Sequence, residues 1–178
     1  MPAVEESKRK ASILVEALPY VRRFRGSIFV IKYGGSFMDS PDPAVRARVA
    51  QDLVFLHFVG IRVVVVHGGG KAVTRELESR GLQAQFVNGL RVTNSDAIQV
   101  VDEALNGKVN EEVASFVTSH DCEVKRIPGK QILNCRKLEQ EPDLGFVGEI
   151  QEVETREILS AMDAGKMPIL SSTGSDES

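Results

Sequence analysis

Short apolar runs alternate with longer amphipathic stretches along most of this chain. The apolar runs at residues 27–33, 61–66 and 167–172 are typical of strands that are covered on both faces of a sheet. Residues 40–60 carry apolar side chains at helical spacing behind Asp42, a residue type that favours the start of a helix. The order strand, helix, strand predicts a βαβ unit with a right-handed crossover.

The rest of the chain continues this alternation. We expect helices at residues 71–81, 93–120 and 155–165, and strands at residues 122–127, 131–138 and 146–153. Gly107 predicts a kink or break within the longest of these helices, and the last two strands are predicted to form a hairpin. This order of elements indicates an α/β domain whose sheet is mostly parallel.

The N-terminal stretch has a pattern of its own. Residues 3–24 place apolar side chains near helical spacing with charges on the other face, which predicts an amphipathic helix ahead of the first strand. Such a helix packs against its own domain or contacts another copy of the chain, and the pattern leaves both readings open. We therefore divide the chain into residues 1–25, a helix and candidate oligomerisation element, and residues 26–178, a single lobe.

Composition and charge exclude several classes of protein. The 178 residues suffice for one domain with a full core, and a net charge of −3 without a Lys/Arg-rich run speaks against a nucleic-acid partner. No apolar run approaches the about 20 residues of a membrane helix, and the N-terminus lacks the apolar core of a signal peptide. We expect a cytoplasmic protein without a metal site, because these residues form no metal-ligand spacing: Cys122, Cys135, His57, His67 and His120.

Two of the predicted strands run into glycine-rich turns, and each turn precedes a predicted helix. Gly34 and Gly35 follow the first strand, and Gly68, Gly69 and Gly70 follow the second. The carboxyl ends of parallel strands are where ligands gather in α/β sheets, and the N-terminus of a helix favours phosphate or carboxylate. Two such turns on successive strands would let two backbone segments approach one anion.

The turn after the second strand does not fit the common nucleotide-binding motifs. A Walker A loop needs Ser or Thr after its Gly-Lys pair, but Ala72 follows Lys71. A dinucleotide fingerprint counted from Gly68 needs a small residue where Val73 stands. Neither a P-loop nor a Rossmann dinucleotide site is predicted.

Two cationic side chains complete the candidate site. Lys32 lies within an apolar strand two residues before Gly34, so we expect its ammonium to emerge beside the glycines, where it could stabilise charge on a phosphoryl group. A lysine on an edge strand that reaches into solvent is the alternative. Arg91 is a candidate carboxylate ligand, because a guanidinium binds a carboxylate through two parallel hydrogen bonds.

Taken together, five stretches resemble the N-acetylglutamate kinases of the amino-acid kinase family. They are ALPYVRRFRGSIFVIKYGGSFM, DLVFLHFVGIRVVVVHGGG, FVNGLRVT, GKVNEEV and GFVGEI, and they occur in the family's order and spacing. The combination of KxGGS, HGGG and GLRVT is specific, although each motif alone is not. The resemblance implies the three-layer αβα sandwich of the amino-acid kinase fold, here its N-terminal lobe.

This resemblance also implies an activity: phosphorylation of the side-chain carboxylate of N-acetyl-L-glutamate, a step of arginine biosynthesis, with MgATP as co-substrate and no tightly bound cofactor. By matching position, Lys32 would stabilise the transferring phosphoryl group, while Gly34 and Gly35 would hold phosphate. Gly68 and Gly69 would offer amides to the acyl-phosphate region and the substrate, and Arg91 would hold the substrate's α-carboxylate. Transfer would be in line without a general base, so catalysis would rest on positioning and charge neutralisation.

Members of this family continue past the PILSS stretch into an asparagine-containing substrate motif and a second lobe that binds ATP. The resemblance therefore implies that the present 178 residues are the substrate lobe and a poor kinase by themselves. A non-catalytic module that binds acetylglutamate or arginine, like the kinase-like domain of some acetylglutamate synthases, is the alternative. A kinase of a related acid such as aminoadipate, carbamate or aspartate is a third reading. The N-terminal helix resembles the extra helix of arginine-inhibited members, which implies a homo-oligomer, a dimer or a hexamer.

Overall fold

A four-stranded sheet, all of whose strands are parallel, forms the centre of the computed structural model, which describes residues 2–35, 40 and 42–176. The strands lie in the order β1-β2-β8-β5. Their bounds are β1 Ile28–Tyr33, β2 Arg62–His67, β5 Val124–Ile127 and β8 Met167–Ser171. The mostly parallel sheet expected from the sequence is therefore confirmed.

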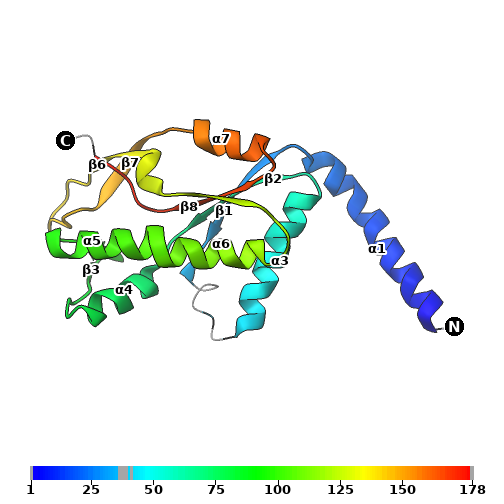
Figure 1. Cartoon of the computed structure of the whole chain (residues 1–178), viewed down its shortest axis with the longest axis horizontal. Coiled ribbons are helices and arrows are strands. Elements are labelled where there is room, and N and C mark those ends of the chain that lie inside the picture. Colours follow the sequence, from blue (N-terminus) through cyan, green and yellow to red (C-terminus); the bar gives the residue numbers. More distant parts are fainter. Residues whose placement is uncertain (1, 36–39, 41, 177–178) are drawn as a thin grey trace.

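Helices cover both faces of this sheet (Figure 1). On one face, α3 (Pro43–Phe58) and α6 (Asn110–Thr118) pack on Val63, Val65 and Ile169. On the other face, α7 (Arg156–Asp163) packs through Ile158 on Val64 and Leu170. Because successive residues of β2 point to opposite faces, its unbroken run of valines fills both cores. This arrangement confirms the three-layer αβα sandwich.

The predicted βαβ unit consists of β1, α3 and β2. The Asp42 side chain accepts a hydrogen bond from the Ala44 amide at 2.9 Å, which satisfies one of the free N–H groups at the start of α3. Gly60 has a φ of 95°, a conformation that glycine adopts readily, and there the chain turns from α3 into β2. Strands β1 and β2 then pair in parallel from Ile28 opposite Arg62 to Tyr33 opposite His67.

The long helix predicted at residues 93–120 is divided into three parts. It runs as α5 (Ser95–Glu103), a π-helical segment η1 (Ala104–Val109) and α6. The break predicted at Gly107 is a widened π turn, and such turns are frequent at functional sites. A separate apolar cluster joins α5 and η1 to α4 (Gly70–Ser79), the helix that follows the second glycine turn.

Two antiparallel hairpins flank the sheet. Strands β6 (Leu133–Lys137) and β7 (Gly148–Val153) form the predicted hairpin, with the short 3₁₀ helix η2 (Gly129–Gln131) ahead of it. The second hairpin, β3 (Gln85–Val87) with β4 (Leu90–Val92), was not among the predicted elements. Its signal is the Asn88-Gly89 pair, whose φ values of 50° and 83° are the two positive angles of a type I′ turn.

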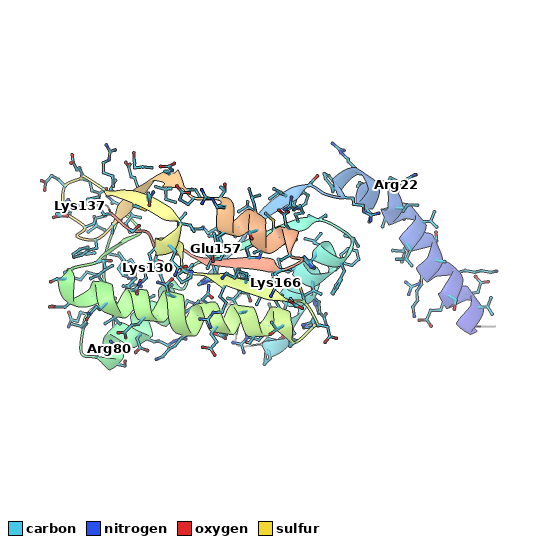
Figure 2. All side chains as sticks on the ribbon, turned by 45° about the horizontal axis from the view of Figure 1, so that its top comes forward. Arg22, Arg80, Lys130, Lys137, Glu157 and Lys166 are labelled. Atoms are coloured by element: carbon cyan, nitrogen blue, oxygen red, sulfur yellow. The ribbon has the colours of Figure 1, made fainter. Side chains whose placement is uncertain are left out.

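Helix α1 (Pro2–Phe24) extends away from the rest of the chain (Figure 1). Arg22 lies in the last turn of this helix, and Figure 2 shows it well away from the other labelled side chains. Other charged side chains project from the same helix. The helix joins the lobe at its C-terminal end, where the Gly26 amide donates to the Gly60 carbonyl at 2.7 Å and the Phe24 and Phe29 rings meet edge to face. Its apolar side chains Leu14 and Val15 remain 69% and 70% exposed.

Among the described residues, no helix combines the length and the apolar character needed to cross a membrane.

Candidate functional site

The two glycine turns lie next to each other at one edge of the sheet. Strands β1 and β2 end in register, with Lys32 opposite Val66, so both turns leave the sheet at the carboxyl ends of neighbouring strands. The Gly68 amide lies 3.4 Å from the Tyr33 carbonyl and donates to it, which links the second turn to the end of β1. The sequence prediction that two backbone segments converge here agrees with this geometry. Ser36 of the KxGGS motif lies outside the described residues.

The glycines of the second turn have different surroundings. A Cβ atom at Gly34, Gly68 or Gly70 would meet no atom within 4 Å, so the space beside these backbone positions is open. A Cβ atom at Gly69 would instead lie 2.8 Å from Leu105 Cδ2. Gly69 therefore permits close packing of η1, whereas Gly68 and Gly70 leave room for a ligand beside the backbone.

Helix α4 begins directly at the second turn. Gly69 is its N-cap residue and supplies no side chain to the free N–H groups of the first turn. These N–H groups and the positive end of the helix dipole therefore face the turn without a side-chain cap, an arrangement that favours an anion.

Arg91, on β4, lies beside the same helix end. Its Nη2 donates to the Gly70 carbonyl and to Thr74 Oγ1, both at 2.8 Å, and its guanidinium lies 4.6 Å from the centre of the Phe86 ring. Its Nη1 atom is buried and has no hydrogen-bond partner among the described residues. Burial lowers the pKa of Arg91 from its usual value, which reflects the cost of holding a cation there. The structure therefore brings Arg91, the residue predicted to bind a carboxylate, next to the glycine turn.

Lys32 lies on an edge strand, as in the second of the two readings that the sequence left open. β1 is the edge strand of the sheet, and the Lys32 side chain is exposed on the face that it shares with Ile28 and Val30. Only the alternate residues of β1, such as Tyr33, contribute to the core with α3. The Lys32 side chain is thus exposed to solvent near the end of β1, two residues before Gly34, and its role in phosphoryl transfer stays a prediction.

A buried polar chain behind the glycine turn was not found by sequence reasoning. His67, fully buried at the end of β2, places Nδ1 2.9 Å from the Gly68 carbonyl and Nε2 2.9 Å from Asn110 Nδ2. Asn110 Oδ1 in turn accepts a hydrogen bond from Arg126 Nε at 2.7 Å. Burial lowers the pKa of His67, and the neighbouring Arg126 charge acts in the same direction, while the hydrogen bond to Gly68 opposes both. His67 is therefore neutral at physiological pH.

The π-helical segment η1 is bound through polar groups to the neighbouring strands. Arg126 Nη2 donates to the Asn106 and Gly107 carbonyls at 3.0 and 3.3 Å, carbonyls that the widened turn leaves accessible. The Asn106 side chain accepts a hydrogen bond from Ser171 at the end of β8, opposite His67 in the strand register. The segment is thus held in place by side chains from β5 and β8.

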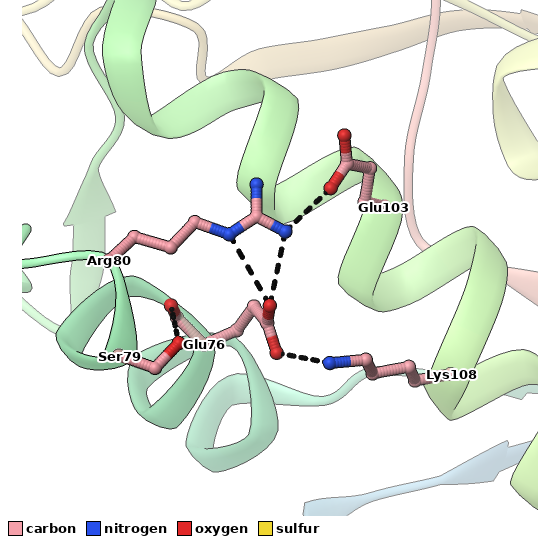
Figure 3. Close-up of polar contacts among 5 residues, drawn as sticks. All are labelled: Glu76, Ser79, Arg80, Glu103 and Lys108. Carbon is pink, nitrogen blue, oxygen red and sulfur yellow. Dashed lines mark hydrogen bonds and ion pairs between the residues drawn. The ribbon is translucent and has the colours of Figure 1, made fainter.

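Ion pairs on the outer side fix α4 against α5 and η1, as Figure 3 shows. The Glu76 carboxylate accepts hydrogen bonds from Arg80 at 3.0 Å and from Lys108 at 2.5 Å, and Arg80 also binds Glu103 at 2.6 Å. The hydrogen bonds from Lys108 and then Arg80 lower the pKa of Glu76. This charged cluster and the apolar cluster beneath it hold the helix that carries the anion-favouring terminus.

The sequence of the chain matches a known protein family over most of its length. The amino acid kinase family matches residues 27–178, which include both glycine turns, Arg91 and the buried polar chain. An acetylglutamate kinase from Campylobacter fetus is 41% identical over 167 residues, which cover 93% of this chain and 59% of that protein. An acetylglutamate kinase from Halothermothrix orenii is 38% identical over 98% of this chain and 61% of that protein. The chain thus spans about three fifths of these relatives.

Solved structures agree with the fold. The protein smu.665 from Streptococcus mutans superposes with a TM-score of 0.75 at 25% identity, over 84% of this chain and 60% of that one. An N-acetylglutamate synthase from Neisseria gonorrhoeae, solved with coenzyme A and N-acetyl-glutamate, superposes with a TM-score of 0.76 at 23% identity, over 93% of this chain and 38% of that one. Because the family matches residues 27–178 and relatives at about 40% identity align with nearly the whole chain, the chain belongs to the amino acid kinase family.

Proposed function

We propose that this chain binds N-acetyl-L-glutamate and presents its side-chain carboxylate for phosphorylation by MgATP. Two acetylglutamate kinases at about 40% identity support the choice of substrate, and both align over nearly the whole chain. The product would be an acyl phosphate, formed when a carboxylate oxygen attacks the terminal phosphorus and the bond to the departing ADP oxygen breaks. A carboxylate is already deprotonated at neutral pH, so this transfer requires no general base.

In this proposal different residues bind different negatively charged groups of the two substrates. Arg91 holds the α-carboxylate, and the amides of Gly68 and Gly69 face the carboxylate that reacts. Gly34 and Gly35, with the Lys32 ammonium beside them, meet the phosphoryl group, where a cation and backbone amides offset negative charge. Catalysis would consist of positioning and charge neutralisation, which suits a site built from backbone amides and two cations.

The observation that carries the proposal is the buried Nη1 atom of Arg91. A buried guanidinium nitrogen without an acceptor costs about 1–3 kcal/mol or more, because its hydration is lost and nothing replaces it. A carboxylate that accepts a hydrogen bond from this atom would remove that cost. The adjacent uncapped terminus of α4 would favour the same negative charge.

An amide NMR titration of the 178-residue chain with N-acetyl-L-glutamate, carried to millimolar concentration, tests the proposal. Saturable shifts at Gly68, Gly69 and Arg91 are expected, and Arg91→Ala should abolish them. Arg62→Ala is the matched control, because Arg62 lies at the first residue of β2, at the end of the strand away from the glycine turn, where it pairs with Asp163. Equal binding by the Arg91 variant and the wild type, or no shift at these residues, would contradict the proposal.

The reaction itself is tested by trapping the acyl phosphate with hydroxylamine in the presence of MgATP. The matched relatives extend well beyond the part that this chain covers, so we propose that the 178 residues alone form the product slowly or not at all. Turnover at a rate comparable to that of those kinases would contradict this part of the proposal. Binding without turnover, even in a chain extended to the relatives' full length, would favour a non-catalytic acetylglutamate-binding module.

A homo-oligomer assembled through α1 also stays a proposal. Its support is the exposed apolar surface of this helix, in which Ile13, Leu14, Val15 and Leu18 are between 49% and 70% exposed. A surface of this kind is stabilised when another protein surface covers it.

A further inference from the structure

The peptide between Gly68 and Gly69 is held from its buried side. Its carbonyl oxygen, that of Gly68, lies 2.9 Å from His67 Nδ1. His67 is fully buried and is packed beneath the turn at the end of β2. Because the peptide is planar and trans, the Gly69 N–H points in the direction opposite to that carbonyl. The contact with His67 thus decides which way the Gly69 N–H faces.

The contact with His67 requires a particular form of the imidazole ring. A carbonyl can only accept, so Nδ1 must carry the proton and Nε2 must accept when the ring is neutral. Asn110 Nδ2, a donor, lies 2.9 Å from that Nε2 and 3.2 Å from the Ile169 carbonyl. The amide side chain of Asn110 therefore selects the tautomer that donates to Gly68.

Asn110 cannot turn its amide around, because its other atom is also bound. Oδ1 accepts from Arg126 Nε at 2.7 Å, and a reversed amide would place two donors against each other there. Arg126 is itself fixed by hydrogen bonds to the Asn106 and Gly107 carbonyls of η1. Each polar group of the chain Arg126, Asn110, His67 and Gly68 thereby sets the orientation of the next.

The outward side of the same peptide is unpartnered. Among the described residues, none accepts a hydrogen bond from the Gly69 N–H, and a Cβ atom at Gly68 would meet nothing within 4 Å. On the inward side, Leu105 and Val109 of η1 pack against Gly69 and leave the peptide little room to rotate. One face of this peptide is fully determined by the protein, and the other is free to meet a ligand.

We propose that Arg126, Asn110 and His67 are positioning residues that hold the Gly69 N–H toward the carboxylate that reacts. The inference rests on the proposed function for the identity of that carboxylate, but the arrangement of the peptide does not depend on it. In this proposal the three side chains act without touching the substrate, since their hydrogen bonds are made to one another and to the backbone. Their effect is to fix a backbone donor before the substrate arrives, which avoids reorganisation when negative charge must be stabilised.

The imidazole nitrogens report directly on this chain of hydrogen bonds. In ¹⁵N–¹H correlation spectra of the ligand-free chain, His67 should show a protonated Nδ1 and an unprotonated Nε2. Asn110→Ala should remove this single tautomer and shift the Gly69 amide. It should also weaken N-acetyl-L-glutamate binding roughly tenfold, the equivalent of one hydrogen bond. Val113→Ala is the matched control, since Val113 is buried on the same helix and contributes only to the apolar core.

A conservative variant separates positioning from general loss of stability. In Asn110→Asp the carboxylate can accept from Arg126 and from a protonated Nε2, so His67 becomes an imidazolium whose Nδ1 still donates to Gly68, while the hydrogen bond to the Ile169 carbonyl is lost. The Gly69 amide shift and the affinity should therefore return to within about threefold of the wild type, although the ring is now charged.

A wild-type His67 protonated at Nε2, or an Asn110→Ala variant with unchanged His67 and Gly69 signals, would overturn the inference. The same holds if Val113→Ala weakens binding as much as Asn110→Ala does. If the wild type shows the predicted tautomer and Asn110→Ala alters it, but N-acetyl-L-glutamate causes no shifts in the wild type, the proposed function fails while the positioning of the peptide stands.

Discussion

Replacing Gly69 by alanine tests the packing of the π-helical segment against the glycine turn. The new Cβ atom would lie 2.8 Å from Leu105 Cδ2 and 3.2 and 3.3 Å from the two Val109 methyl groups. Carbon atoms in good contact are about 3.5–4.0 Å apart, so the closest approach is roughly 0.7 Å too short (3.5 − 2.8). The φ of Gly69 is 170°, outside the left-handed region that favours glycine, so we assign the cost to this steric contact.

Overpacking of this kind costs about 1–3 kcal/mol. The lower end is expected if Leu105 can change rotamer, and the upper end if the backbone of η1 has to move. In a chain of this size the melting temperature should fall by about 2–4 °C for each kcal/mol. Gly68→Ala and Gly70→Ala are matched controls, because a Cβ atom at either position meets nothing within 4 Å. Gly70→Ala should be neutral or slightly stabilising, since Gly70 is the first residue of α4.

Urea unfolding followed by circular dichroism measures these free energies. Adding Leu105→Ala should relieve the clash, so that the two substitutions together cost less than the sum of their separate effects. Equal stability of the Gly69→Ala and Gly70→Ala variants would refute the reasoning, as would strict additivity with Leu105→Ala. The loss of ligand affinity should rank the variants differently from the loss of stability. Gly68→Ala should fold normally, but its added methyl group should obstruct the binding of N-acetyl-L-glutamate.

Three further predictions concern charge and assembly. Burial lowers the pKa of His67 below its ordinary 6.5. His67 is therefore protonated at a lower pH in the native state than in the unfolded chain. The free energy of unfolding should therefore fall as the pH drops from about 7.5 through 6.5 to about 5.5, and fall less in His67→Gln; equal slopes in urea titrations would contradict this. Glu76→Gln should lower the melting temperature at neutral pH. The difference from the wild type should vanish as the pH falls below 4.5 and through the lowered pKa of Glu76. A difference that stays constant with pH would speak against the ion pairs. Removal of residues 1–24 should reduce the oligomeric state in sedimentation, and an unchanged oligomer would exclude α1 as the assembly element.

Local signals predicted most of the fold. Asp42 marked the start of α3 because a cap acts within its own turn, and the valines of β2 marked a strand covered on both faces. The β3–β4 hairpin was missed although its Asn88-Gly89 turn is a strong short-range signal; the strands on either side are only three residues long.

The buried polar chain could not be predicted in the same way, because its pairing is not local. Asn110 and His67 are separated by 43 residues, and they meet only when α6 packs on the sheet. The GKVNEEV stretch marks Asn110 as part of a family motif, but its partner and its burial are visible only in the structure. Lys32 is a different case: the sequence left open whether it stabilises a phosphoryl group or simply reaches into solvent from an edge strand, and β1 is an edge strand that exposes it.

A crystal structure of this chain with N-acetyl-L-glutamate would test the central claim most directly. The account predicts the α-carboxylate within hydrogen-bond distance of Arg91 Nη1 and the side-chain carboxylate facing the Gly69 N–H. It also predicts that the Gly68 carbonyl keeps its contact with His67. A ligand bound away from the glycine turn, or an Arg91 Nη1 that still lacks an acceptor in the complex, would contradict it.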